Sequence, residues 1–181
     1  MELIKNLREI SFVKNLFLAI IGTIFLTISA KIKIPFWPVP MTMQTFVVLM
    51  LGLVYGWKLG LLTVGLYLLE GIVGLPVFAG TPEKGIGFIY FTGPTMGYLI
   101  GFLVAVFFTG FITFNNSFLI NFFKLVFSVS FIYLLGLAWL GSLIGWDKPI
   151  FELGAKPFLL AELLKVILLT ILIPKILKFR S

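Results

Sequence analysis

Long runs without a charged residue alternate along this chain with short segments that carry the charges. There are 39 uncharged residues between Lys84 and Lys124, 24 between Lys33 and Lys58, and 22 between Lys124 and Asp147. A membrane-spanning helix needs about 20 apolar residues. The pattern therefore predicts an all-α protein with six spanning helices, of which the second and third are short and closely joined: residues 12–30, 41–56, 59–75, 94–114, 118–145 and 157–178.

The composition agrees with a chain that lies in a lipid bilayer. The chain is 60% hydrophobic and 12% charged, with a mean hydropathy of +1.16, whereas a soluble domain is about 25% charged. Its 181 residues are enough for one domain. We therefore predict a single integral membrane domain over residues 1–181, whose first helix is retained and is not a cleaved signal peptide.

The residue types exclude several classes of function. The chain has no Cys and no His, which excludes disulfides, thiolate nucleophiles, Cys/His zinc sites and imidazole chemistry. It also lacks the phosphate-binding motif G-x-x-x-x-G-K-[ST]. We expect no enzyme activity, catalytic residue, metal or cofactor. The net charge is +7. Its Lys and Arg residues flank the apolar segments, as topology signals do, and therefore do not indicate nucleic-acid binding.

Six spans place both termini on the same side of the membrane. On that side we count eight basic residues, namely Lys5, Arg8, Lys14, Lys58, Lys124, Lys175, Lys178 and Arg180. The other side has five, namely Lys31, Lys33, Lys84, Lys148 and Lys156. The side with more Lys and Arg is normally cytoplasmic, so we expect cytoplasmic termini.

A proline-rich, uncharged segment, IPFWPVPMTMQTF, follows the first predicted helix at residues 34–46. Three prolines cannot lie within one regular helix. One interpretation is a connector packed against neighbouring helices. The other is a lid over a ligand, in which Phe36 and Trp37 cover an apolar ring while Thr42 and Gln44 supply polar contacts, since irregular backbone at membrane depth lines a cavity or is buried.

A second irregular segment, residues 74–102, is rich in Gly and Pro. Three of its glycines, Gly93, Gly97 and Gly101, are spaced by four residues and are typical of close helix packing. Tyr98 lies beside that glycine face. Lys84 is the segment's cation, and it either neutralises a substrate carboxylate or lies in solvent.

Two ionisable residues occur inside the last apolar segment. Glu162 and Lys165 are three residues apart and share a helix face. Such groups within a membrane are functional candidates by default, although a mutual ion pair or snorkelling also explains them.

Small residues at Ala19, Thr23 and Thr27 form a strip for close helix association, either with another helix of this chain or with another subunit.

Four segments of the chain together resemble BioY, the biotin-specific substrate-binding component of energy-coupling factor transporters. They are PVPMTMQT, GLPVFAGTPEKGIG, GPTMGYLIGF and KPFLLAELLK, and they are distributed over nearly the whole chain. The resemblance implies a six-helix membrane protein that captures biotin and adds Val77, Phe78 and Thr95 to the candidate substrate-binding residues. It also places Glu162 where the family usually has Asp, while Lys165 matches.

The resemblance further implies a partner module and a location. The partners are a transmembrane coupling protein, for which Ala19, Thr23 and Thr27 would be the docking strip, and two cytoplasmic ATPases. The implied location is a bacterial-type inner cell membrane.

Biotin has two ureido N–H donors and one C=O acceptor, which a carboxylate and an ammonium on one face can bind. Alternatives are a component for another vitamin, a proton-coupled carrier using Glu70, Glu162 and Lys165, a membrane enzyme and a ligand-free anchor.

Overall fold

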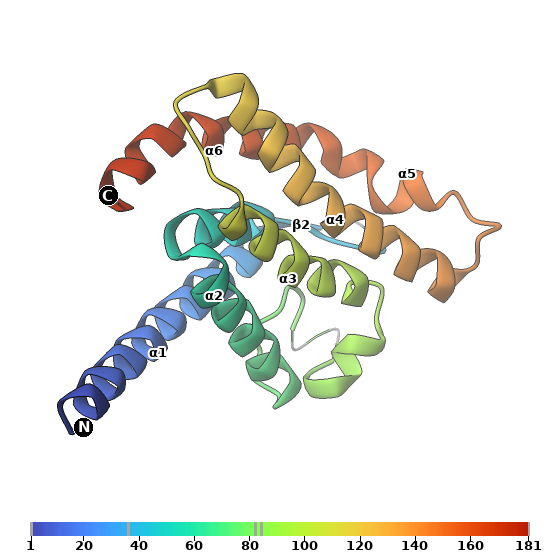
Figure 1. Ribbon diagram of the computed structural model, residues 1–181. Helices are drawn as coiled ribbons and strands as arrows, with labels where there is room; N and C mark the ends of the chain where they lie inside the picture. The colour runs from blue at the N-terminus through green and yellow to red at the C-terminus, as the bar shows by residue number, and fades with distance from the viewer. Residues whose placement is uncertain (1, 36, 82, 84, 181) are drawn as a thin grey trace.

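The computed structural model in Figure 1 is built almost entirely from helices. It describes residues 2–35, 37–81, 83 and 85–180, and the side chains of residues 12–35, 37–81, 83 and 85–178. The long helices are α1 (Glu2–Lys31), α2 (Gln44–Ile72), α3 (Met96–Phe111), α4 (Phe118–Ile144) and α6 (Leu159–Arg180). The short elements are β1 (Lys33–Ile34), β2 (Met41–Thr42), η1 (Gly87–Thr92), α5 (Ile150–Gly154) and η2 (Lys156–Phe158).

Helix α2 is a hairpin of two helical arms that meet at Gly56. Gly56 has φ 74° and ψ 176°, a conformation that glycine adopts readily because it has no Cβ. The Gln44 amide nitrogen lies 2.8 Å from the Tyr67 hydroxyl, whereas residues 23 apart in a straight helix are about 34 Å apart. The two arms correspond to the predicted short helices at 41–56 and 59–75.

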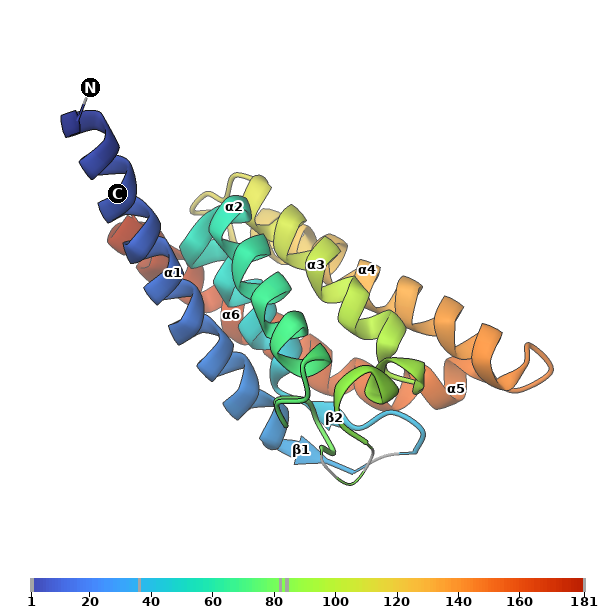
Figure 2. The ribbon, with the colours of Figure 1, turned by 90° about the horizontal axis from the view of Figure 1, so that it is seen from below.

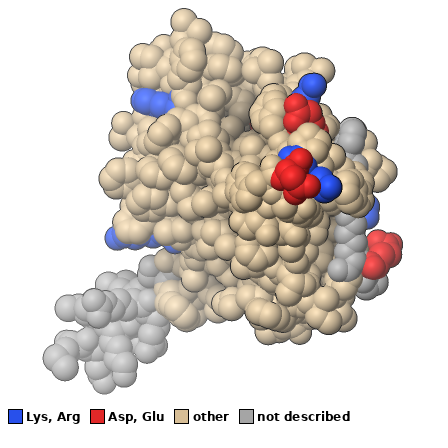
Figure 3. All heavy atoms as spheres, turned by 90° about the vertical axis from the view of Figure 1, so that its right-hand side faces the viewer, with Lys and Arg blue, Asp and Glu red and all other residues tan. Residues whose placement is uncertain are grey.

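The other predicted helices are also present, with ends shifted by a few residues, except that α1 begins at Glu2 and the predicted helix at residue 12. Among the described residues, four helical stretches have the length and apolar composition to cross a membrane: Phe12–Lys31, Gln44–Ile72, Phe118–Ile144 and Ile150–Lys178. The second of these is folded at Gly56 into the two arms of α2, the fourth combines α5, η2 and α6, and α3 is a shorter apolar helix. Figure 3 shows a surface with only a few charged side chains. Figures 1 and 2 both show the two termini at the same end of the bundle.

The proline-rich segment forms a small β-hairpin, which the sequence pattern did not predict. Strands β1 and β2 pair antiparallel, with Lys33 opposite Thr42 and Ile34 opposite Met41. Two residues per strand are too few to produce an alternating pattern of polar and apolar positions. The prolines at 35, 38 and 40 lie in the connection between the strands, where they remove no hydrogen bond from the ladder.

Helix α3 packs closely against α4 through the glycine face predicted for helix association. A Cβ on Gly101 would lie 2.6 Å from Cα of Ile132, and one on Gly97 would meet the backbone of Leu135. Larger residues at these positions would push the two helices apart. Helix packing is therefore the role of Gly97 and Gly101.

Helix α1 lies along the edge of the bundle and packs mainly on α2 (Figure 2). Ala19 and Thr23 of the small-residue strip are buried, and Thr27 is half-buried. The hydroxyl of Thr23 donates a hydrogen bond to Glu70 of α2 at 2.9 Å. Ala19 and Thr23 therefore pack within this chain, as one of the two interpretations of the strip predicts, and a contact of the strip with another subunit stays a prediction. The outward face of α1 carries large side chains instead.

Candidate functional site

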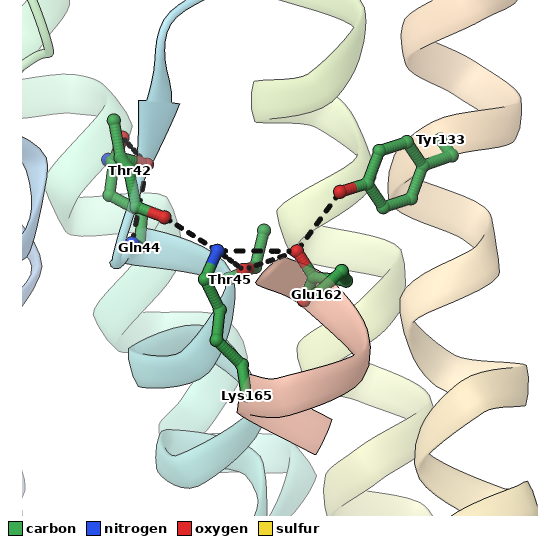
Figure 4. A network of polar contacts seen from close by, with 6 residues as sticks. All are labelled: Thr42, Gln44, Thr45, Tyr133, Glu162 and Lys165. Carbon is green, nitrogen blue, oxygen red and sulfur yellow. Dashed lines mark hydrogen bonds and ion pairs between the residues drawn. The ribbon is translucent and has the colours of Figure 1, made fainter. Parts of the chain in front are cut away.

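Glu162 and Lys165 of α6 form the centre of a buried polar network (Figure 4). Their exposed fractions are 4% and 9%. Oε2 of Glu162 accepts hydrogen bonds from the hydroxyls of Thr45 at 2.9 Å and Tyr133 at 3.0 Å. The ammonium of Lys165 lies 3.4 Å from the same oxygen. A buried charge is tolerated when it is paired and hydrogen-bonded in this way.

The ammonium of Lys165 has acceptors for all three of its protons. Besides Glu162, it donates to the carbonyl of Thr42 at 2.7 Å and to the hydroxyl of Thr45 at 3.0 Å. An ammonium has three donors. Lys165 therefore fastens α6 to β2 and to the start of α2, and the longest of its three contacts is the one to Glu162.

The second carboxylate oxygen of Glu162, Oε1, is buried and has no hydrogen-bond partner among the described residues. An unpaired buried acceptor costs about 1–3 kcal/mol, so a donor placed against Oε1 would recover that cost. The site therefore presents one saturated oxygen, Oε2, and one oxygen that can accept a hydrogen bond from an N–H group.

A pocket of about 580 Å³, its mouth included, opens beside this network. Small-molecule sites are mainly apolar, with a few placed polar groups. The lining fits that description. It comprises Val39, Pro40, Met41, Thr42, Gln44, Thr45, Phe78, Ala79, Tyr90, Thr95, Tyr98, Leu99, Phe102, Ile132, Tyr133, Phe158, Glu162 and Lys165.

The two irregular segments that the sequence marked out both contribute to this pocket. The proline-rich hairpin supplies residues 39–42, and the segment after α2 supplies residues 78–79. These segments are separated by the whole of α2 in the sequence. Their convergence on one cavity supports the interpretation of the hairpin as part of a cap and disfavours a simple connector.

One wall of the pocket is held by side chains from three different elements. The carbonyl oxygens of residues 77, 78 and 79 accept hydrogen bonds from Tyr67 of α2 at 3.0 Å, Lys31 of α1 at 3.1 Å and Tyr90 of η1 at 2.6 Å, respectively. Burial raises the pKa of Tyr90, which keeps this phenol a neutral donor. Gln44, whose amide donates to Tyr67, connects the wall to the pocket interior.

Most of the predicted substrate-binding residues line the pocket. They are Thr42, Gln44, Phe78, Thr95, Tyr98, Glu162 and Lys165. Two do not: Trp37 is 76% exposed, and Val77 is buried outside the pocket lining. Trp37 lies in the loop of the hairpin and faces outward, while the carbonyl of Val77 is held by Tyr67. The remaining two, Phe36 and Lys84, fall outside the described residues.

Thr45 and Tyr133 belong to the site but were not predicted. Thr45 lies in the segment PVPMTMQT, next to Gln44, and its position on the face toward α6 depends on where α2 begins. Tyr133 is a single phenol within the long apolar run of α4. A hydroxyl in the middle of a predicted span is a signal that could have marked it, because buried Tyr hydroxyls usually find a partner.

Glu70, the other carboxylate considered for chemistry, lies away from the pocket. It accepts a hydrogen bond from Thr23 of α1 and is not among the pocket-lining residues. Within the described residues, no group of three or more acidic side chains is placed to hold a metal ion. Among the described residues that line the pocket, Glu162 is the one carboxylate.

Comparison with known proteins gives consistent matches over most of the chain. The sequence model of the BioY family matches residues 4–181. A probable biotin transporter BioY from Pyrococcus horikoshii is 37% identical over 158 residues, which cover 87% of this chain and 89% of the relative. The biotin transporter BioY of Thermotoga maritima is 36% identical over 155 residues, with 85% and 90% covered. A crystal structure of the S-component for biotin from an ECF-type ABC transporter superposes with a TM-score of 0.76 at 28% identity, covering 93% of both chains.

Proposed function

The chain belongs to the BioY family, and from this premise we propose that it binds biotin as the substrate-binding component of an ECF-type vitamin uptake transporter. It is a multi-pass membrane protein of a transporter family. We propose that the chain acts as one substrate-binding domain without enzymatic activity or a cofactor, and that biotin is the transported ligand.

The observation that carries this proposal is the buried carboxylate of Glu162, which keeps one unpaired oxygen beside a mainly apolar pocket. Biotin offers a ureido N–H as the matching donor, and an apolar ring system for the rest of the pocket. Charge-assisted hydrogen bonds of this type are about twice as strong as neutral ones. Lys165 can donate to the ureido C=O if that new hydrogen bond replaces its 3.4 Å contact with Glu162.

The other functions considered have less support. An ion-coupled carrier that uses Glu70 together with Glu162 would need the two carboxylates near one pathway, but Glu70 lies at the contact between α1 and α2. A ligand-free anchor does not account for the unpaired oxygen of Glu162. The chain has no phosphate-binding motif, so we propose that a transmembrane coupling protein and two cytoplasmic ATPases supply the energy.

The proposed orientation places the pocket outside the cell and both termini in the cytoplasm of a bacterial-type inner membrane. The support is the count of eight basic residues on the side of the termini against five on the other. A cysteine introduced in the hairpin loop should react with an impermeant maleimide in intact cells, whereas one introduced at Ser117 should not. The reverse labelling pattern would overturn the orientation.

We also propose that the proline-rich hairpin orders over the bound ligand, that Phe36 covers the ligand ring and that Lys84 neutralises the biotin carboxylate. The prolines limit the entropy that the loop loses on ordering. Limited proteolysis with and without biotin tests the movement. Protection of the hairpin by biotin is expected, and equal cleavage in both states would refute a lid.

The direct test of the function is a binding titration of the purified chain in detergent. We expect saturable binding of biotin with one site per chain. N1′-methylbiotin, which lacks one ureido N–H, should bind more weakly, because the unpaired oxygen of Glu162 loses its donor. Absence of biotin binding by folded protein would overturn the proposed function. Uptake into liposomes that concentrates biotin without ATPases would overturn the proposed dependence on them.

A further inference from the structure

We propose that Tyr133 is a positioning residue that determines which oxygen of Glu162 the ligand meets. This inference rests on the proposed function, because it concerns how the same pocket recognises the ureido ring. The hydroxyl of Tyr133 donates a hydrogen bond to Oε2, which leaves Oε1 to accept one from an N–H donor of the ligand. Tyr133 thus acts on the ligand through Glu162.

The carboxylate of Glu162 is held from two opposite sides. Figure 4 shows Tyr133 of α4 approaching Oε2 from one side, and Thr45 and Lys165 from the other. The last torsion of a Glu side chain has a broad energy profile, so it does not fix the carboxylate plane by itself. Hydrogen bonds must fix the plane, and Tyr133 is the donor to Oε2 on the α4 side.

The hydroxyl of Tyr133 is itself held in place by aromatic packing. Its ring lies edge-on to the ring of Tyr98, with centroids 6.3 Å apart and an interplanar angle of 88°. Tyr98 is anchored by its hydroxyl, which donates to the carbonyl of Gly154 at 2.8 Å. Gly136 makes room for this arrangement, because a Cβ there would collide with the Tyr98 ring. The position of the donor is therefore set before a ligand arrives.

The ring of Tyr133 has a role that is separate from the role of its hydroxyl. Tyr133 and Glu162 line both the pocket and an apolar groove between α4 and α6 on the outside of the bundle. The ring therefore forms part of the wall between the two spaces. Substitution by Phe keeps that wall and removes only the donor, which makes Tyr133→Phe the informative variant.

The test compares three ligands on three proteins in detergent. The ligands are biotin, N1′-methylbiotin, which lacks a ureido N–H, and biotinamide, which lacks the carboxylate. The proteins are the wild type, Tyr133→Phe and the control Tyr55→Phe, whose hydroxyl donates to the carbonyl of Leu18 away from the pocket. Thermal unfolding of each protein without ligand shows that it is folded.

We expect Tyr133→Phe to weaken biotin binding about tenfold, the scale of one hydrogen bond to a charged group. The preference for biotin over N1′-methylbiotin should fall by a similar factor, while the preference for biotin over biotinamide should stay unchanged. Tyr55→Phe should match the wild type. An unchanged affinity in Tyr133→Phe, or an equal loss for all three ligands, would overturn the positioning role.

Thr45 provides a second route to the same answer if Tyr133→Phe does not fold. Thr45→Val removes the hydroxyl donor from the opposite side of Oε2 and should reduce the same ureido preference. Thr45→Ser should restore it. Failure of serine to rescue would contradict control by donors to Oε2. If wild-type protein does not bind biotin, the proposed function fails; if it binds and these patterns are absent, only the positioning role fails.

Discussion

Glu162 and Glu70 are both carboxylates on apolar helices, but their surroundings differ. Glu162 is 4% exposed, and two hydroxyls and an ammonium contact one of its oxygens. Glu70 is half-buried and accepts a hydrogen bond from Thr23 of the neighbouring helix. One carboxylate lines a pocket and the other joins two helices.

The comparison shows that an acidic residue in an apolar helix does not by itself identify a binding site. At Glu162 the donors come from α2, α4 and α6, so three helices have to meet for the site to exist. At Glu70 the hydrogen bond stabilises the packing of α1 on α2. The variants below test whether this division of roles holds.

The largest effect is expected for Lys165→Met. Removing the ammonium leaves the carboxylate of Glu162 buried without its cation, and breaking such a pair costs about 3–5 kcal/mol. We expect biotin affinity to fall at least about 100-fold and the melting temperature to drop. Isothermal titration and thermal unfolding measure the two effects.

The matched control for Lys165→Met is Lys175→Met on the same helix, where the side chain is exposed. This variant should leave the biotin affinity and the melting temperature unchanged. The double variant Glu162→Gln/Lys165→Met should recover part of the lost stability without recovering binding. Biotin affinity that is intact in Lys165→Met would remove this ion pair from the site.

An intermediate effect is expected for Lys31→Met. The Lys31 ammonium donates to the carbonyls of Phe78 and Thr81 at 3.1 and 3.3 Å, and so holds one wall of the pocket. Because Lys31 is exposed, we expect biotin affinity to fall only about threefold. The control is Lys33→Met, whose side chain pairs with exposed Glu83 at 3.9 Å. Equal affinities in the two variants would show that the wall does not depend on Lys31.

A small effect is expected for Glu70→Gln. The amide oxygen of Gln can still accept the hydrogen bond from Thr23, and the position is outside the pocket. Biotin affinity should change by less than about threefold, with a modest change in melting temperature. A tenfold loss of affinity or of uptake would instead favour the ion-coupled carrier, because that function assigns the carboxylate a direct role.

The smallest effect is expected for Trp37→Ala. Trp37 is 76% exposed and does not line the pocket, so biotin affinity should change by less than about twofold, as for other surface substitutions. Titration of the variant alongside wild type measures the change. A larger loss would mean that the hairpin carries this ring onto the ligand when biotin binds.

The sequence was sufficient for the long helices and for the centre of the site. Charge-free runs located the spans, and the spacing of Glu162 and Lys165 predicted their shared face. Both depend on the local sequence alone. The β-hairpin was missed because its strands have two residues each, which leaves no periodic signal.

Features that depend on how distant segments meet were beyond a single sequence. Tyr133 reaches Glu162 across 29 residues and Thr45 across 117, so neither contact is encoded in a local pattern. The strip at Ala19 and Thr23 has the same spacing whether it faces another helix or another subunit. Only the packing of α1 on α2 shows that it faces inward.

The central claim is that the carboxylate of Glu162, and not that of Glu70, binds the ligand. Titration of biotin into Glu162→Gln and Glu70→Gln tests it most directly, since both substitutions remove one charge and preserve shape. We predict that Glu162→Gln loses at least about 100-fold in affinity, while Glu70→Gln binds as the wild type does. Wild-type affinity in Glu162→Gln, or equal losses in the two variants, would contradict the claim.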